Sequence, residues 1–431
     1  MTSHSALVAR GFGIPTVVGC SEISVNADDR FFSVGETVIR EGTPISLNGA
    51  TGEVIVGAVE VVPAIVTGEF EILLKWADEE RHLGVRANAD TPEDAALAIR
   101  FGAEGLGLVR TEHMFFGEER RPIVQWIILA SSDDERQVQL DKLLEFQRQD
   151  FEEIFLALGG RPATVRLIDP PLHEFLPNYE LLIEQVASAL ATGRDVRAEA
   201  ALLDKVRALH EVNPMMGLRG CRLSLVFPQI IAMQTRALME GAIAARKAGV
   251  EVHPEIMIPL VSHVHELKAI RKQLEPIARA IVEEAGVTID YQFGTMIEIP
   301  RAAVTANRIA AYADFFSFGI NDLTQMAFGF SRDDWDIFLK PYLEQGILPR
   351  DPFQTIDQDG VGELMRESAQ KGRSACPDIK VGICGEHGGD PESIALCHRI
   401  GLDYVSCGPY RVPIARLAAA QATLKGTERD R

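Results

Sequence analysis

The sequence predicts an α/β protein whose larger part is a closed (β/α)8 barrel, preceded by a small β-rich domain. From about residue 73 onward, apolar runs of strand length alternate with long amphipathic stretches such as 92–100 and 234–247, as expected for repeated βα units. Eight parallel strands, each followed by a helix, close into a barrel, and a doubly wound open sheet is the structural alternative. The eight runs lie at 83–86, 105–109, 164–168, 255–259, 294–299, 315–319, 380–383 and 404–406.

Residues 1–70 have a different texture. They are rich in Val, Ile and Gly, with strand-like runs at 15–19, 44–47 and 52–56 separated by turn signals such as Asn48-Gly49. A chain of 431 residues is expected to form more than one domain. We therefore expect a β-rich domain at 1–70 and the barrel at 71–431. The excursion from Asp169 to Val252 is too long for a simple crossover and predicts extra helices.

Bulk composition excludes some classes of protein. The formal net charge of −19 opposes a nucleic-acid or anionic-membrane surface, while a local basic pocket for a small anion stays compatible with it. The six cysteines have neither paired nor metal-type spacing, so we interpret them as reduced thiols. No signal-like or long apolar segment is found, and a soluble cytoplasmic protein is expected.

Polar residues follow several of the predicted strands, at the end where barrel enzymes carry their active sites. Arg110, Arg166 and Arg219 could place guanidinium groups over a phosphate or carboxylate, which they bind through paired hydrogen bonds. For any one arginine, an ordinary salt bridge is the alternative interpretation. Their shared location favours an anion site.

Two carboxylates suggest a metal site. Glu298 lies inside the predicted strand 294–299, where an unpaired charge would be costly, and Asp322 follows the next strand. Carboxylates on adjacent strands suit Mg²⁺, which keeps water or substrate oxygens in its other positions. The alternative is that Asn321 and Asp322 cap a helix beginning near Leu323.

Cys384 lies in a glycine-flanked turn beside Glu386, where a thiol can meet a ligand and donate a proton. A buried, inert cysteine is the ordinary interpretation of such a residue, and it is the one we adopt for Cys407.

These motifs together resemble the C-terminal part of the pyruvate phosphate dikinase family of PEP-utilising enzymes. The resemblance covers essentially the whole chain. Phosphoenolpyruvate synthases and enzyme I of the sugar phosphotransferase system share shorter versions, whereas DPPLHEF and GEHGGD are typical of the dikinase branch. The strings are GLGLVRTEHMFF at 105–116, RLIDPPLHEF at 166–175, NPMMGLRGCR at 213–222, MIEIPR at 296–301 and CGEHGGD at 384–390.

The resemblance implies a TIM barrel that binds pyruvate and phosphoenolpyruvate (PEP) with Mg²⁺, and a homodimer formed through the barrel. Cys384 would exchange a proton with the methyl carbon, so that an enolate is protonated to pyruvate or formed from it. Ile320 stands where the family usually has threonine, so one hydroxyl is missing. The implied substrate-binding residues are Arg110, Arg166, Arg219, Glu298, Gly319, Ile320, Asn321 and Asp322, with Glu298 and Asp322 as the Mg²⁺ ligands.

The N-terminus matches the family's phosphohistidine motif. A Thr-Ser-His string is followed by small residues, and His4 corresponds to the phosphoryl carrier of a swivelling domain; without the motif, a frayed terminal histidine would be the better interpretation. The resemblance implies that the first half of that domain and an ATP-binding region are absent here. No glycine-rich phosphate loop is found. We expect only the pyruvate half-reaction, with a separate ATP-binding chain as a candidate partner.

Three functions remain open at this stage. The first is a phosphotransferase half-enzyme that interconverts phosphohistidine plus pyruvate with PEP. The second is a non-catalytic module that binds PEP or pyruvate. The third is another Mg²⁺-dependent, enolate-forming barrel enzyme, such as a lyase acting on a 2-oxo acid, in which His4 has no role.

Overall fold

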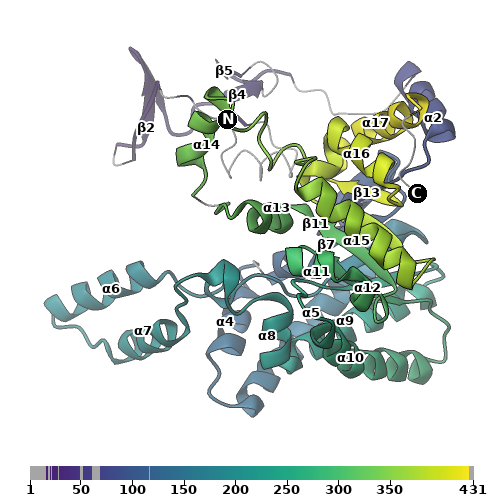
Figure 1. Cartoon of the computed structure of the whole chain (residues 1–431). Helices are drawn as coiled ribbons and strands as arrows, with labels where there is room; N and C mark the ends of the chain where they lie inside the picture. The colour runs from purple at the N-terminus through teal and green to yellow at the C-terminus, as the bar shows by residue number, and fades with distance from the viewer. Residues whose placement is uncertain are drawn as a thin grey trace.

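In a computed structural model of the chain, residues 16–17, 20, 22–27, 29–48, 52–60, 68–115, 117–332 and 334–426 are described. The dominant feature is a closed barrel of parallel strands (Figure 1). The strand order is β10-β11-β12-β13-β6-β7-β8-β9, so the barrel is confirmed and the open sheet is wrong. Its strands are β6 (Gly84–Asn88), β7 (Leu106–Arg110), β8 (Pro162–Arg166), β9 (His253–Ile258), β10 (Gln292–Ile297), β11 (Phe315–Gly319), β12 (Lys380–Cys384) and β13 (Tyr404–Cys407).

Each predicted run overlaps one of these strands, with small differences at the ends. The starts of β8, β9 and β10, at Pro162, His253 and Gln292, each lie two residues before the predicted runs. Strand β10 ends at Ile297, so Glu298 is the first residue beyond the strand and not inside it as predicted. That position places its side chain at the rim of the barrel.

Helices form a layer around the strands (Figure 1). Local caps explain where several of them begin and end: Ser132 accepts a hydrogen bond from the Glu135 amide at the start of α5, and Gly159 ends it with a φ of 56°. The helices are α2 (Glu69–Glu80), α3 (Pro92–Arg100), α4 (Arg121–Leu129), α5 (Asp133–Leu158), α6 (Tyr179–Ala191), α7 (Arg197–Leu209), α8 (Gly220–Val226), α9 (Pro228–Lys247), α10 (Val264–Ala285), α11 (Pro300–Val304), α12 (Ala306–Ala310), α13 (Ile320–Phe328), α14 (Asp336–Glu344), α15 (Val361–Ala375), α16 (Pro391–Ile400) and α17 (Val412–Leu424).

Four helices, α6 to α9, lie between β8 and β9 where a simple crossover has one, so the prediction of extra helices is confirmed. Helices α6 and α7 extend together away from the barrel (Figure 1), whereas α9 packs against α5. The side chain of Gln234 in α9 accepts a hydrogen bond of 2.9 Å from the Ile168 amide. This contact fixes the segment that leads from β8 to Asp169.

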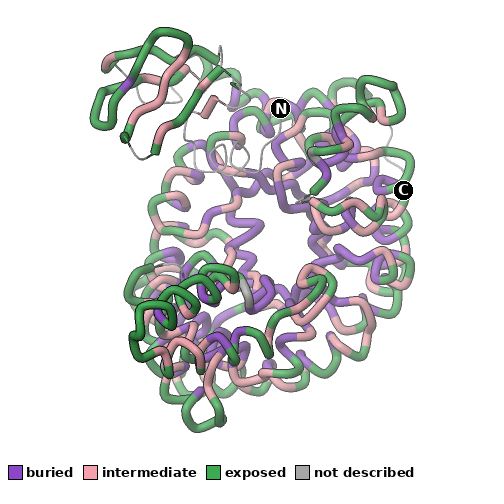
Figure 2. The backbone as a smooth tube through the Cα atoms, turned by 90° about the vertical axis from the view of Figure 1, so that its left-hand side faces the viewer, coloured by how far each residue is buried: buried purple, intermediate pink, exposed green. Residues whose placement is uncertain are grey.

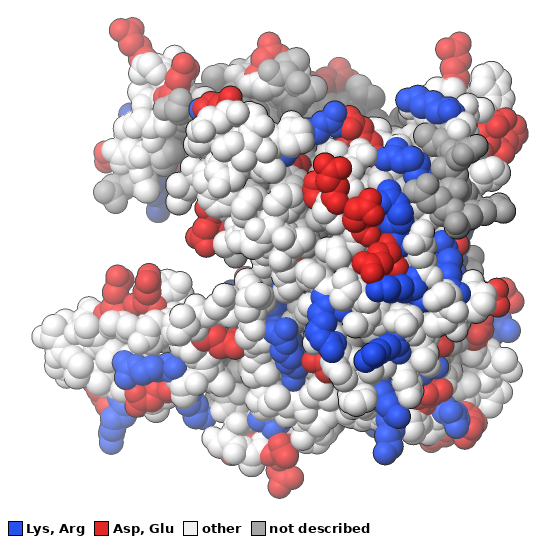
Figure 3. Space-filling model, in the orientation of Figure 1, with Lys and Arg blue, Asp and Glu red and all other residues white. Residues whose placement is uncertain are grey.

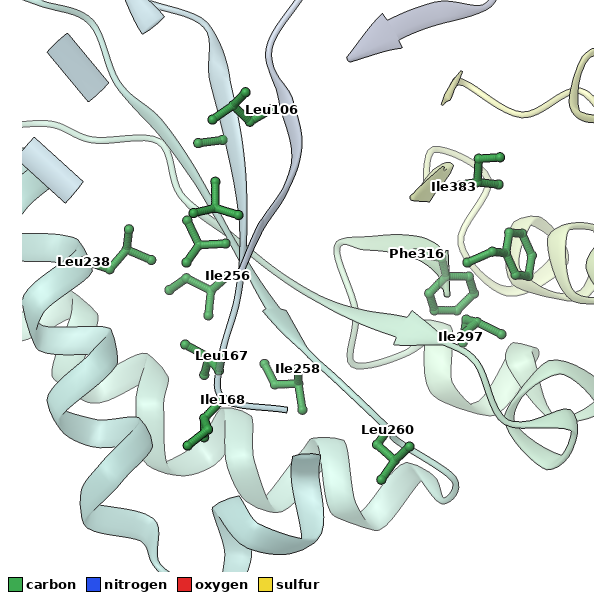
Figure 4. Close-up of a cluster of buried hydrophobic side chains, with 14 of the residues drawn as sticks. Leu106, Leu167, Ile168, Leu238, Ile256, Ile258, Leu260, Ile297, Phe316 and Ile383 are labelled. Atoms are coloured by element: carbon green, nitrogen blue, oxygen red, sulfur yellow. The ribbon is translucent and has the colours of Figure 1, made fainter. Parts of the chain in front are cut away.

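Alternate side chains of the strands enter two separate apolar clusters. One set, which includes Ile256, Ile297 and Phe316, packs between the barrel and its helices (Figure 4). A smaller cluster of Leu108, Met257, Met296, Phe315 and Cys384 is distinct from it. Because neighbouring residues of a strand point to opposite faces, the smaller cluster lies inside the barrel, and the Cys384 thiol points inward with it.

The N-terminal strands form two antiparallel sheets, β1-β2-β3 and β4-β5. Strands β4 (Ile45–Asn48) and β5 (Glu53–Val56) confirm two predicted runs, while β1 (Ile23–Asn26), β2 (Phe31–Val34) and β3 (Thr37–Arg40) were not predicted. Of the run at 15–19, only Thr16 and Val17 are described, and they are not in a strand. Ile39 is the one buried residue among the described positions before 61, in contrast to the ring of buried backbone in the barrel (Figure 2).

The surface carries charges of both signs. On the face shown in Figure 3, acidic and basic side chains are interspersed over the barrel helices. Within the described residues, no helix has the length and apolar character that a membrane crossing requires.

Helix α2 is held on α17 by a partly buried ion pair. Arg416 donates from Nε to Asp78 Oδ1 (3.0 Å) and from Nη1 to the Phe101 carbonyl (2.9 Å). Burial acts to raise the pKa of Asp78, but hydrogen bonds from Arg416 and Arg81 outweigh it, and the net pKa is lowered. A carboxylate whose pKa is lowered by folding stabilises the protein at pH values above its unfolded-state pKa, which is near 3.8. This contribution is lost as the pH falls through the lower folded-state pKa.

Replacing Asp78 by asparagine is therefore expected to lower the free energy of unfolding at pH 7 by about 1 kcal/mol, a value discounted because the carboxylate is partly exposed. Urea unfolding at pH 7 and at pH 3 measures it, and the difference between variant and wild type should shrink at the lower pH. Asp195→Asn, which removes an ion pair between two exposed side chains, is the control and should not change stability. An equal loss at both pH values would contradict the argument.

Candidate active site

The carboxyl ends of the barrel strands open into a cavity of ≈ 330 Å³. Strand register places the predicted residues at a common rim, since Arg110 lies opposite Arg166 and Gly319 lies opposite Cys384. His4 lies outside the described residues. The other predicted site residues all line the cavity: Arg110, Arg166, Arg219, Glu298, Gly319, Ile320, Asn321, Asp322 and Cys384.

Each of the three predicted arginines is paired with a carboxylate. Arg166 contacts Glu112 and lies 3.0 Å from Asp169. Arg219 bridges two carboxylates, with Nη2 2.7 Å from Asp169 and Nη1 3.1 Å from Asp322. Both guanidinium groups are almost completely buried, so these contacts orient them firmly toward the cavity.

Arg110 is held by a residue that the sequence reasoning missed. Asp90 accepts the backbone amide of Arg110 at 2.6 Å and its Nη1 at 3.3 Å, and it also lies 2.8 Å from His113 Nδ1. Burial acts to raise the pKa of Asp90, but Arg110 and His113 outweigh it and the pKa is lowered. Asp90 stands two residues beyond β6, so the rule that identified the other rim residues could have found it.

The cavity is strongly acidic for a site that carries so many arginines. Eight carboxylates stand against four guanidinium groups in its lining, the latter being Arg110, Arg166, Arg219 and Arg332. An anionic ligand would enter against this excess of negative charge unless a cation accompanied it. The charge balance thus favours a site for an anion together with a divalent cation.

The excess of negative charge is most evident at Glu298. It is fully buried, and its Oε1 accepts the Leu260 amide at 2.5 Å, while Oε2 has no hydrogen-bond partner among the described residues. Burial, followed by the charges of Asp322 and Asp169, raises the pKa of Glu298 well above its usual range. The Leu260 backbone has a φ of 60°, which is strained for leucine, and this conformation aims its amide at Glu298.

A small space lies beside that unpartnered oxygen. A Cβ atom at Gly319 would come within 2.5 Å of Glu298 Oε2, so only glycine leaves the position open. Within the described residues, no three Asp, Glu, His or Cys side chains form a metal site by themselves. Two protein carboxylates are nevertheless compatible with Mg²⁺, which takes its remaining oxygens from water and substrate. Glu298 and Asp322 thus fit the ion that the sequence predicted.

The capping alternative for Asn321 and Asp322 is wrong. Helix α13 begins at Ile320, earlier than expected, and its N-cap residue Gly319 makes no side-chain hydrogen bond. Asn321 and Asp322 lie in the first turn of α13 and line the cavity instead. Ile320 is fully buried and packs in the core between the barrel and its helices, so the threonine that the resemblance predicts is replaced here by an apolar contact.

Cys384 is buried, with 3% of its surface exposed, yet it lines the cavity. Its thiol lies 3.7 Å from the Phe318 carbonyl oxygen. Burial raises its pKa to about 11, although Ser317, Arg166 and Arg110 act in the opposite direction. The thiol therefore holds its proton at neutral pH and can act as an acid. Cys407 is also buried, but in the outer core, as the interpretation of an inert cysteine predicts.

Two further residues of the cavity were not predicted. Glu386 accepts a hydrogen bond of 2.8 Å from Asn321 Nδ2, and Arg332 Nη2 lies 3.8 Å from Glu386 Oε1. Burial acts to raise the pKa of Glu386, but Arg332, Asn321 and Arg110 lower it to about 2. Its position in the CGEHGGD string, two residues after Cys384, was the available signal.

Known proteins are similar to this chain over almost its whole length. The PEP-binding domain of PEP-utilising enzymes matches residues 66–424, and the mobile domain of PEP-utilising enzymes matches residues 1–52. Pyruvate, phosphate dikinase of Flaveria bidentis, a chloroplastic protein, is 53% identical over 98% of this chain and 44% of its own length. Pyruvate, phosphate dikinase of Clostridium symbiosum is 51% identical over 98% of this chain and 48% of its own.

The chain thus spans less than half the length of these relatives. Among solved structures, RipC from Yersinia pestis superimposes with a TM-score of 0.31 at 10% identity, over 78% of this chain and 94% of that one, which supports no inference. Since one domain model alone covers residues 66–424 and the relatives align over 98% of the chain at more than 50% identity, the chain belongs to the PEP-utilising enzyme family.

Proposed function

We propose that this chain carries the pyruvate half-reaction of a pyruvate phosphate dikinase, in which a phosphohistidine at His4 and pyruvate are interconverted with PEP. The observation that carries the proposal is the cavity, where a protonated thiol, paired arginines and an unpartnered carboxylate oxygen meet. The names of the relatives support the choice of substrates. The proposal includes a phosphohistidine domain at 1–70 that moves relative to a barrel at 71–431.

Each group of the cavity has a role in this proposal. Arg110, Arg166 and Arg219 would bind the carboxylate and the phosphoryl group through charged hydrogen bonds. Glu298 and Asp322 would hold Mg²⁺, which when bound supplies positive charge beside the substrate oxygens and offsets the acidic lining.

Cys384 would move the proton. Its thiol, kept protonated by burial, would protonate the methyl carbon as pyruvate forms and recover that proton in the reverse direction. The buried position keeps water away from the enolate, which water would otherwise protonate in place of the thiol. Homodimerisation through the barrel and a separate ATP-binding chain are further parts of the proposal.

Intact mass measurement after incubation with PEP and Mg²⁺ tests the proposal. We expect a gain of one phosphoryl group on the wild-type chain and none on His4→Ala, because only an imidazole nitrogen at that position can accept it. Incubation with EDTA is the second control and should prevent the gain.

The other outcomes identify the alternatives. Mg²⁺-dependent binding of oxalate without any mass gain would indicate a module that binds without transfer. Turnover of a 2-oxo acid that is unaffected by His4→Ala would indicate another enolate-forming enzyme. Either result would overturn the phosphotransfer proposal.

A further inference from the structure

We propose that Glu386, itself held by Arg332, is a positioning residue that fixes the side-chain amide of Asn321, so that Asn321 offers its ligand a carbonyl oxygen and not an N–H group. What the cavity binds rests on the proposed function. The arrangement of these three side chains can be tested without any turnover.

The direction of the Asn321 amide follows from the chemistry of its partner. Glu386 Oε2 lies 2.8 Å from the Asn321 amide nitrogen. Glu386 remains ionised at neutral pH, since its pKa is lowered to about 2. An ionised carboxylate only accepts hydrogen bonds, so the amide nitrogen must face it. Asn321 Oδ1 is then directed elsewhere, and it is buried without a hydrogen-bond partner among the described residues.

The three residues form one unit that joins β12 to α13. Glu386 follows β12 through Gly385, whose φ of 111° is a conformation that favours glycine. Asn321 lies in the first turn of α13. The Arg332 amide donates a hydrogen bond of 3.0 Å to Gln325 Oε1, also in α13. The carboxylate of Glu386 therefore connects the end of β12 to Asn321, at the start of α13, and to Arg332, which follows the end of α13.

This arrangement restricts what Asn321 can recognise. An amide oxygen accepts hydrogen bonds and can also coordinate a cation, whereas it repels the bare keto and carboxylate oxygens of pyruvate. An unsatisfied buried acceptor is costly, and a ligand that supplies the missing donor gains that energy on binding. The inference thus assigns Asn321 Oδ1 to a water or a cation that lies between it and the substrate, and not to a bare substrate oxygen.

The test of orientation uses NMR of the chain labelled with ¹⁵N-asparagine. The Asn321 NH₂ signals are assigned by their loss in Asn321→Ala. In wild type we expect one of the two protons to exchange with solvent slowly, and in Glu386→Gln to exchange about tenfold faster or more. Arg332→Lys should preserve the slow exchange better than Arg332→Met. Glu392→Gln, an exposed residue of the next helix paired with Arg350, is the matched control and should leave the signals unchanged.

A double-mutant cycle tests the consequence for the site. The readout is kcat/KM for exchange of pyruvate methyl protons with solvent in the presence of Mg²⁺. If Glu386 acts through Asn321, Glu386→Gln lowers the rate about tenfold in wild type and has no further effect in Asn321→Ala. If the rate loss in the double variant equalled the product of the losses in the two single variants, the proposal would be overturned. Unchanged Asn321 signals in Glu386→Gln would also overturn it. A wild type without exchange would refute the proposed function, and the NMR result would still decide the positioning role.

Discussion

Cys384→Ala is expected to lower the rate at which pyruvate methyl protons exchange with solvent by about 10²–10⁴-fold, the usual contribution of a positioned acid or base. The thiol lines the cavity, and its pKa, raised to about 11 by burial, keeps the proton in place. Alanine occupies a similar buried space but has no acidic hydrogen to transfer. Loss of the methyl signal of pyruvate in D₂O, followed by ¹H NMR with Mg²⁺, measures the rate.

A second buried cysteine provides a matched control. Cys407 lies on the neighbouring strand β13 and is buried to a similar extent, but it packs in the outer core and not in the cavity lining. Cys407→Ala should therefore retain the wild-type exchange rate. Equal rates for Cys384→Ala and wild type would remove the thiol from the proposed reaction, and equal losses in both variants would indicate a structural effect.

The barrel could be predicted because its strands are buried on both sides and are therefore continuous apolar runs. The strand ends could not be predicted to the residue, because hydrogen-bonded pairing continues into residues that are not apolar. Strand β9, for example, begins two residues before the predicted run, at His253, which pairs with Pro162 of β8. Strands β1 to β3 were not predicted, because each has four residues and only Ile39 among them is buried, so no sustained hydrophobic pattern marks them.

The site shows a similar limit. Residues just beyond strands could be selected by their chemical type, and barrel closure brings Arg110, Glu298 and Cys384 to one cavity. Their partners Asp90 and Glu386 stand two residues beyond β6 and β12, where the same rule could have selected them. Their role of holding other side chains could not be predicted, because it depends on contacts between segments that are distant in the chain. The strained Leu260 backbone is likewise a consequence of packing, since it depends on segments that are distant in the chain.

Glu298→Gln is expected to weaken Mg²⁺-dependent binding of oxalate by more than about 100-fold, since the loss of residues that merely support a metal ligand already costs 10–100-fold. The same substitution should stabilise the protein when no metal is present. Its Oε1 can still accept the Leu260 amide, and the new NH₂ group can donate toward the carboxylates of Asp322 and Asp169. Calorimetry with oxalate, with and without Mg²⁺, measures the binding.

The stability gain should depend on pH with a definite sign. Burial and the nearby carboxylates raise the folded-state pKa of Glu298. A group whose pKa is raised by folding stabilises the protein at pH values below its unfolded-state pKa. That stability is lost as the pH rises through its folded-state pKa. In EDTA, the wild type should therefore weaken as the pH rises, while Glu298→Gln should not. The difference should reach about 1–2 kcal/mol at alkaline pH, as measured by urea unfolding.

Glu255→Gln is the matched control, because it removes another buried carboxylate whose surroundings have the opposite effect. Glu255 lies 2.6 Å from Arg86 and 3.1 Å from Lys380. Burial acts to raise its pKa, but Arg86 and Lys380 outweigh it and the pKa is lowered. Its replacement leaves the buried Arg86 guanidinium without its anionic partner, which typically costs about 3–5 kcal/mol. If Glu298→Gln destabilised the metal-free protein as Glu255→Gln does, Glu298 would be a structural carboxylate, and the charge excess would not explain a cation site.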